Sequence, residues 1–190
     1  MTDSEPTALR QLILVTGPAR SGKSEWAESR AAGSGKQVIY VATGLVDETD
    51  LEWMRRLEQH RNRRLVDWET LEVPIELPAV VRSASASDCL LIDSVGTWTA
   101  NLLEQEAQVW TTAQGDLLGA LKSTAADIIL VGEETGWGVV PAYPAGRLFR
   151  DRLGTLVRRI GAIADAVYLV TGGYALDLSA LGTPLPPANN

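Results

Sequence analysis

The sequence has few of the side chains that many proteins use for cross-links, metals and surface charge. Its 190 residues include one cysteine, one histidine and three lysines. Cys89 begins the apolar run Cys89–Ile92, so we expect a buried thiol, no disulfide framework and a reducing compartment. No apolar run approaches the length of a membrane span, and Met1–Pro6 lacks the basic and apolar regions of an export signal. We therefore predict a cytoplasmic protein without a membrane partner.

Positive charge is also scarce. The chain has 17 basic and 24 acidic residues, which gives a formal net charge of −7. Because binding to nucleic acid depends on a basic surface, this balance predicts that nucleic acid is not a partner. Anionic ligands must instead be bound at local positive sites.

Strands and helices alternate along the chain, which predicts an α/β fold with a mostly parallel sheet and helices on both faces. The length suits a single domain over 1–190, with loose ends at 1–10 and 180–190. The expected strands are Leu12–Val15, Gln37–Gly44, Cys89–Asp93, Ile128–Val131 and Ala166–Val170. The expected helices are Ser24–Ala32, Asp47–Arg64, Trp98–Trp110, Gly115–Ala126 and Arg147–Ala164.

The stretch from Gly17 to Ser24 matches the phosphate-binding pattern G-x-x-x-x-G-K-[ST]. It lies between an apolar strand and a helix, which is the context that the motif needs. Backbone N–H groups of the loop can converge on a phosphate at the positive end of the helix dipole. Lys23 would reach the β- and γ-phosphates, and the Ser24 hydroxyl would bind Mg²⁺. The alternative is an ordinary Gly-Ser turn with an exposed lysine.

Asp93 follows four apolar residues, as the acidic residue of a Walker B strand does. In P-loop enzymes that carboxylate lies beside the phosphates and helps to hold Mg²⁺. Taken alone, an aspartate at this point is most often just the end of a strand. The upstream phosphate-binding motif favours the functional interpretation.

His60 is the only histidine, and five arginines surround it within the ten residues 55–64. A lone histidine is usually a surface or capping residue, and an arginine run is often a solvated helix face. However, a neutral imidazole can attack phosphorus, and arginines can neutralise the oxygens of the attacked phosphate.

Several motifs together resemble one known family, and the resemblance covers nearly the whole chain. Besides the phosphate-binding loop, they are Tyr40–Thr43, Arg56-Leu-x-x-His60-x-x-x-Arg64, Trp68–Glu72, Leu91–Asp93 through Trp98 and Asn101–Leu103, Glu134–Pro141, Arg147–Asp151 and Ala164–Val170. The sequence resembles the bifunctional adenosylcobinamide kinase and adenosylcobinamide-phosphate guanylyltransferase family of cobalamin biosynthesis.

The resemblance implies a P-loop NTPase with a RecA-like core that forms a homotrimer and uses GTP, ATP and Mg²⁺. Its substrates would be adenosylcobinamide and its phosphate. A nucleoside triphosphate would phosphorylate the aminopropanol hydroxyl, and His60 would then carry GMP from GTP to the corrinoid phosphate, giving adenosylcobinamide-GDP.

The resemblance also assigns roles to individual residues. His60 and Lys23 would be catalytic, and Ser24 and Asp93 would hold the metal. Glu72 could accept hydrogen bonds from the N1 and N2 donors of guanine. The implied nucleotide contacts are Gly17, Pro18, Ala19, Arg20, Ser21, Gly22, Lys23, Ser24, Ala42, Thr43, Gly44, Arg61, Asn62, Arg63, Arg64, Glu72 and Asp93.

The chain departs from the family pattern at a few positions. Pro18 replaces a usual glycine, Gly132-Glu133 replaces Ser-Asn, and Val157 replaces a common asparagine. The alternatives are a P-loop kinase of another small alcohol, in which His60 is structural, and a non-catalytic GTP-binding protein. The second predicts an Asn-Lys-x-Asp segment, and no asparagine of this chain is followed by lysine.

Overall fold

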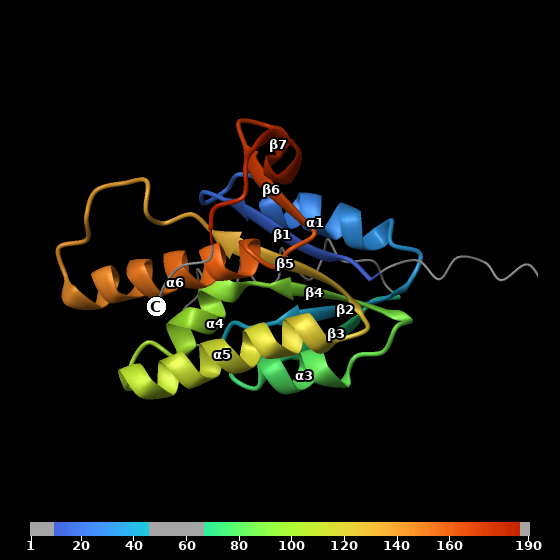
Figure 1. Ribbon diagram of the computed structural model, residues 1–190, viewed down its shortest axis with the longest axis horizontal. Helices are drawn as coiled ribbons and strands as arrows, with labels where there is room; N and C mark the ends of the chain where they lie inside the picture. Colours follow the sequence, from blue (N-terminus) through green and yellow to red (C-terminus); the bar gives the residue numbers. More distant parts are fainter. Residues whose placement is uncertain (1–9, 46–66, 187–190) are drawn as a thin grey trace, which may run out of the picture.

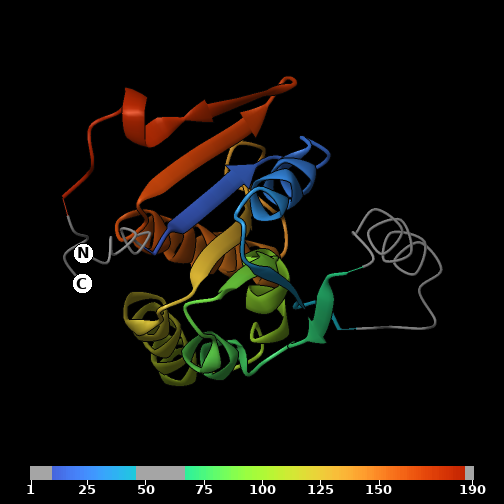
Figure 2. The ribbon, with the colours of Figure 1, turned by 90° about the vertical axis from the view of Figure 1, so that its right-hand side faces the viewer.

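A computed structural model describes residues 10–45 and 67–186 of the chain. These residues form a seven-stranded sheet in the order β3-β2-β4-β5-β1-β6-β7, with helices on both faces (Figures 1 and 2). The strands are β1 Leu12–Gly17, β2 Gln37–Ala42, β3 Glu69–Glu72, β4 Asp88–Asp93, β5 Asp127–Glu133, β6 Ala166–Thr171 and β7 Tyr174–Asp177. The helices are α1 Lys23–Ala32, α3 Leu77–Ser83, α4 Val95–Asn101, α5 Ala107–Ser123, α6 Pro144–Gly161 and α7 Leu178–Leu181.

The predicted mostly parallel sheet is confirmed. Every neighbouring pair of strands is parallel except β6 with β7. Each strand expected from an apolar run is present, with shifts of one or two residues at some ends. The helix expected over Asp47–Arg64 lies outside the described residues.

Two apolar clusters cover the two faces of the sheet, and the alternation of side chains along β1 explains both. Leu12 and Leu14 belong to the larger cluster, which also contains residues of α3, α4, α5 and α6. Ile13 and Val15 belong to the smaller cluster, to which α1 contributes Ala27 and Ala31. Because both faces of the central strands are covered, these strands are continuously apolar.

The helix expected over Trp98–Trp110 is wrong, because two helices share that stretch. Ser94 caps α4 in a capping box with Thr97, so the helix begins three residues before Trp98. It ends at Asn101, and α5 then runs without interruption from Ala107 to Ser123. Trp110 therefore belongs to the same helix as Gly115 and Leu121.

The buried side chain of Arg152 on α6 holds the connection between α4 and α5. Its guanidinium donates hydrogen bonds to the carbonyls of Leu102, Leu103 and Gln105 at 2.9–3.0 Å. The same group lies 5.2 Å from the ring centroid of Trp110. Contacts between Arg152 and residues about fifty positions earlier in the chain therefore set where α4 ends and α5 begins.

Four short elements were not predicted from the sequence. They are the edge strands β3 and β7 and the helices α3 and α7. Most residues of β3 and β7 are exposed, so these strands lack the apolar alternation that marks a strand in sequence. Residues Gly182–Pro186, which follow α7 within the predicted loose end, form no helix or strand.

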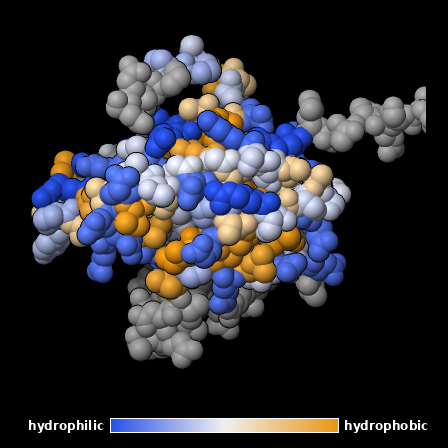
Figure 3. All heavy atoms as spheres, turned by 60° about the horizontal axis from the view of Figure 1, so that its bottom comes forward, coloured by the Kyte–Doolittle hydropathy of each residue, from blue (hydrophilic) through white to orange (hydrophobic). Residues whose placement is uncertain are grey.

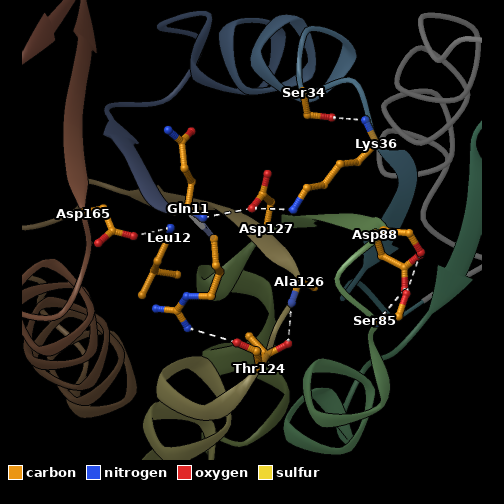
Figure 4. Close-up of polar contacts among 12 residues, drawn as sticks. Gln11, Leu12, Ser34, Lys36, Ser85, Asp88, Thr124, Ala126, Asp127 and Asp165 are labelled. Atoms are coloured by element: carbon orange, nitrogen blue, oxygen red, sulfur yellow. Dashed lines mark hydrogen bonds and ion pairs between the residues drawn. The ribbon is translucent and has the colours of Figure 1, made fainter. Parts of the chain in front are cut away.

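Carboxylates and a lysine close the amino-terminal edge of the sheet (Figure 4). Asp127 accepts a hydrogen bond from the Gln11 N–H at 2.9 Å and pairs with the Lys36 ammonium at 2.8 Å. Asp165 accepts from the Leu12 N–H at 2.7 Å. These groups satisfy backbone donors and one another, so we interpret this edge as structural.

Polar and apolar side chains are interspersed on the helical face that is turned forward in Figure 3. Within residues 10–45 and 67–186, none of the helices combines the length and the apolar character that a membrane crossing requires.

Replacing Arg152 with methionine tests the Arg152 contacts. We expect the Arg152→Met variant to lose about 2–4 kcal/mol of unfolding free energy, because three carbonyls lose charged donors. Arg158→Met on the exposed side of the same helix is the matched control and should change stability by less than about 0.5 kcal/mol. Urea unfolding followed by circular dichroism measures both, and equal stabilities for the two variants would contradict this role.

Candidate nucleotide site

The carboxyl ends of the parallel strands bring most of the predicted site residues to one edge of the sheet. Ala42 at the end of β2 pairs with both Glu72 of β3 and Asp93 of β4. Gly17 at the end of β1 pairs with Glu133 at the end of β5. Open α/β sheets bind their ligands at this edge.

The phosphate-binding loop has the form that the sequence predicts. It leaves β1 at Gly17 and enters α1 at Lys23, with Arg20 and Gly22 at φ values of 60° and 90°. Gly17 is required by close packing, since a Cβ atom there would lie 2.4 Å from the Val170 carbonyl oxygen. Gly22 is the N-cap residue of α1 and offers the first-turn amides no side-chain acceptor of its own, so this helix start suits an anion.

Lys23 and Ser21 lie within this loop. The Lys23 side chain is largely buried, and its ammonium donates a 3.3 Å hydrogen bond to the Pro18 carbonyl. The Ser21 hydroxyl is buried and has no hydrogen-bond partner among the described residues. A bound phosphate would supply acceptors for both groups.

A hydrogen-bond network ties the end of β2 to the end of β4. The Thr43 hydroxyl donates to the Ser94 carbonyl at 2.6 Å and accepts from the Ser94 N–H at 2.9 Å. The Asn101 amide donates to the carbonyls of Thr43 and Pro74 at 2.7 and 3.0 Å. Thr43 is fully buried, and its N–H donates to the Asp93 carbonyl at 3.4 Å, so this residue positions the two strand ends.

Asp93 is half-buried at the end of β4, and its carboxylate accepts a 2.9 Å hydrogen bond from the Tyr40 hydroxyl. Ser24 is the second residue of α1. Among the described residues, no three His, Cys, Asp or Glu side chains come together as a metal site. Mg²⁺ at a phosphate site needs only one or two protein ligands besides phosphates and water, so Ser24 and Asp93 fit this ion.

Glu133 is a functional candidate that stands at one of the departures from the family pattern. Its carboxylate accepts a hydrogen bond from the Ser94 hydroxyl, and its Oε2 atom is buried without a partner in the described part of the chain. Burial raises the pKa of Glu133, the nearby Asp93 charge adds to the rise, and Lys23 and the Ser94 hydrogen bond oppose it. Gly96 leaves room for this carboxyl, because a Cβ atom there would lie 1.9 Å from Oε2.

The next residue along the chain, Glu134, joins β5 to β1. It accepts a 2.5 Å hydrogen bond from the Thr16 hydroxyl, and its N–H donates to the Gly17 carbonyl at 3.0 Å. The edge therefore carries acidic groups at Glu72, Asp93, Glu133 and Glu134. Sequence reasoning did not assign roles to Ser94, Thr97, Asn101 or Glu134, although Asn101 and Glu134 lie in the motifs noted above.

The remaining predicted site residues are His60, Arg61, Asn62, Arg63 and Arg64, and all of them lie outside the described residues. The described chain passes the sheet edge at Ala42–Leu45 and resumes at Asp67, before the amino end of β3, which is parallel to β2. The segment that contains His60 therefore follows directly after residues of the candidate site.

Solved structures with little sequence similarity share the fold. An ATP synthase subunit from Nanoarchaeum equitans aligns with a TM-score of 0.51 at 12% identity, over 91% of this chain and 52% of that one. A Pyrococcus horikoshii protein aligns with a TM-score of 0.54 at 7% identity, over 95% of this chain and 94% of that one. These likenesses support the α/β P-loop fold alone.

Three proteins with related sequences are more similar to this chain than these structures are. The bifunctional adenosylcobalamin biosynthesis protein CobP of Pseudomonas aeruginosa is 41% identical over 93% of this chain and its own full length. CobU of Salmonella typhimurium is 34% identical, and CobU of Escherichia coli is 32% identical, each over 88% of this chain and 99% of its own length. Residues 13–178 match the family model described as cobinamide kinase / cobinamide phosphate guanyltransferase, and the chain belongs to this family.

Proposed function

We propose that the protein phosphorylates the aminopropanol hydroxyl of adenosylcobinamide and then transfers GMP from GTP to the resulting phosphate. The main support is that the phosphate-binding loop at Gly17–Ser24 lies at the same sheet edge as Asp93. The chain also belongs to this family. The nucleotides would be GTP, with ATP or GTP in the first step. We also propose a cytoplasmic homotrimer as the working form.

In the first step the acceptor hydroxyl oxygen bonds to the γ-phosphorus of the triphosphate. The bond from that phosphorus to the β–γ bridging oxygen breaks, the nucleoside diphosphate leaves, and the hydroxyl proton passes to solvent. The loop amides and Lys23 hold the phosphates, while Ser24 and Asp93 would hold Mg²⁺, which neutralises charge on the phosphate oxygens.

In the second step an imidazole nitrogen of His60 bonds to the α-phosphorus of GTP, and pyrophosphate leaves. The corrinoid phosphate then attacks the same phosphorus, the phosphorus–nitrogen bond breaks, and His60 is regenerated. Arg61, Arg63 and Arg64 would neutralise the phosphate oxygens during both attacks. The start of the His60 segment directly after Ala42–Leu45 at the nucleotide edge supports this assignment.

Guanine would be selected by Glu72. This residue is exposed at the end of β3, where its partner in register is Ala42. A carboxylate accepts two hydrogen bonds from the N1 and N2 donors of guanine, and the base of ATP presents no such pair.

The kinase half must accommodate Glu133 at a position where the family usually has an amide. A protonated carboxyl resembles an amide, because one oxygen accepts a hydrogen bond and the other donates one. Ser94 donates to one oxygen of Glu133, and burial raises the pKa of this carboxyl. This chemistry supports retention of the first step.

Labelling with GTP that carries a radioactive α-phosphate tests the second step. We expect an acid-labile, base-stable label on the wild type and none on His60→Asn, since a phosphoramidate forms only on the imidazole. The kinase of another alcohol predicts no label on either protein. GTP labelled at the γ-phosphate is the control and should leave no such adduct. An unlabelled wild type would disprove the transferase.

Replacement of Glu72 tests guanine selection. In Glu72→Gln we expect KM for GTP to rise about tenfold or more while KM for ATP stays unchanged, because one guanine donor loses its acceptor. Glu69→Gln at the other end of β3 is the matched control. Steady-state kinetics with each nucleotide measures the effect, and equal changes for both nucleotides would reject the role.

Replacement of Glu133 tests the cost of its burial. The Glu133 carboxyl has its ordinary pKa in the unfolded chain and a raised pKa in the folded protein. Raising the pH through the interval between these two pKa values therefore destabilises the fold. Glu133→Gln removes this cost, and its gain in Tm should be larger at about pH 8 than at about pH 5. Thermal unfolding without nucleotide measures the two gains, and a gain that does not grow with pH would refute the interpretation.

A further inference from the structure

A large pocket lies along α6, on the face of the sheet opposite α1. Its volume is about 940 Å³, near the upper end of the roughly 300–1,000 Å³ that is usual for ligand pockets. Residues of β1, α5, α6 and the segment Gly182–Pro186 form its walls. Figure 1 shows the chain after α7 running beside α6 toward the C-terminus. A simple alcohol would leave most of this volume unfilled.

One end of the pocket reaches the nucleotide edge. Thr16, Glu133 and Glu134 line it there, and Thr16 directly precedes the first residue of the phosphate-binding loop. The hydrogen bond from the Glu134 N–H to the Gly17 carbonyl joins this wall to the loop. The unpartnered Oε2 atom of Glu133 lies at the same end. A ligand in the pocket could therefore extend a short arm to the phosphates.

The walls combine flat apolar surface with basic groups. Gly115, Gly119 and Gly154 present helix backbone to the pocket, and a Cβ atom built on any of them would meet nothing within 4 Å. Leu14 and Leu118 supply apolar surface. Lys122, Arg150, Arg158 and Arg159 supply hydrogen-bond donors. Such walls suit a broad, flat ring system whose rim carries carbonyl oxygens.

We propose that this pocket binds the corrin ring of the acceptor and directs its hydroxyl arm past Thr16 and Glu134 to the nucleotide. The proposal rests on the proposed function, which supplies a corrinoid as acceptor. A corrinoid has a wide macrocycle with amide side chains and a short alcohol arm. The macrocycle matches the pocket in size, and the arm would extend toward the end of the pocket that Thr16 and Glu134 line.

Filling the pocket from either helical wall tests this assignment. The variants are Gly154→Phe on α6 and Gly119→Phe on α5, where an added Cβ atom meets nothing within 4 Å. We expect each to raise KM for adenosylcobinamide by about tenfold or more by steric exclusion. Thr155→Phe, on the same helix but outside the pocket, is the matched control and should leave this KM unchanged. Circular dichroism and KM for the triphosphate verify the fold of each variant.

The outcomes separate this proposal from the proposed function. If the wild type does not phosphorylate adenosylcobinamide, the proposed function fails. If the wild type is active and both phenylalanine variants keep its corrinoid KM, the pocket assignment alone fails. Guanylylation by α-labelled GTP without corrinoid should persist in both variants, whereas loss of labelling together with the higher KM would indicate a general distortion and reject the assignment.

Discussion

The candidate site depends on the register of the parallel strands β3, β2, β4, β5 and β1. Their ends place Glu72, Ala42 and Asp93 in line, and Gly17 beside Glu133. A slip of one residue in any pair would turn each side chain to the opposite face of the sheet. Apolar clusters on both faces oppose such a slip, because each central strand buries alternate side chains in each cluster. The core thus fixes the geometry of the nucleotide edge.

Polar contacts refine what the register sets. Ser94 follows Asp93, caps α4, pairs with Thr43 and donates to Glu133. One residue therefore fixes the relative positions of three strand ends beside the phosphate-binding loop. Asn101 at the end of α4 extends the same network to the chain that leaves β3. Because these groups are buried, loss of one partner would leave another without a hydrogen bond.

The parts of the molecule that sequence predicts are those with local causes. The phosphate-binding loop carries its own glycines, lysine and serine, and Asp93 follows a continuous apolar run. The break between α4 and α5 escaped prediction because Arg152, far along the chain, binds the carbonyls of the connecting turn. The edge strand β7 escaped it because exposed residues lack a two-residue apolar period. The role of Ser94 depends on three strands that meet only in the fold.

Glu133 shows how a departure from a family pattern can be accommodated by its neighbours. A larger acidic side chain at the end of β5 needs space, and Gly96 on α4 provides it, since any Cβ atom there would collide with Oε2. The same carboxyl accepts a hydrogen bond from Ser94, and the charge of Lys23 opposes part of the rise in its pKa. The acid is therefore built into the phosphate edge by contacts from two other elements. The size of the side chain at position 133 is thus limited by the absence of a side chain at position 96, so the two positions are best considered as a pair.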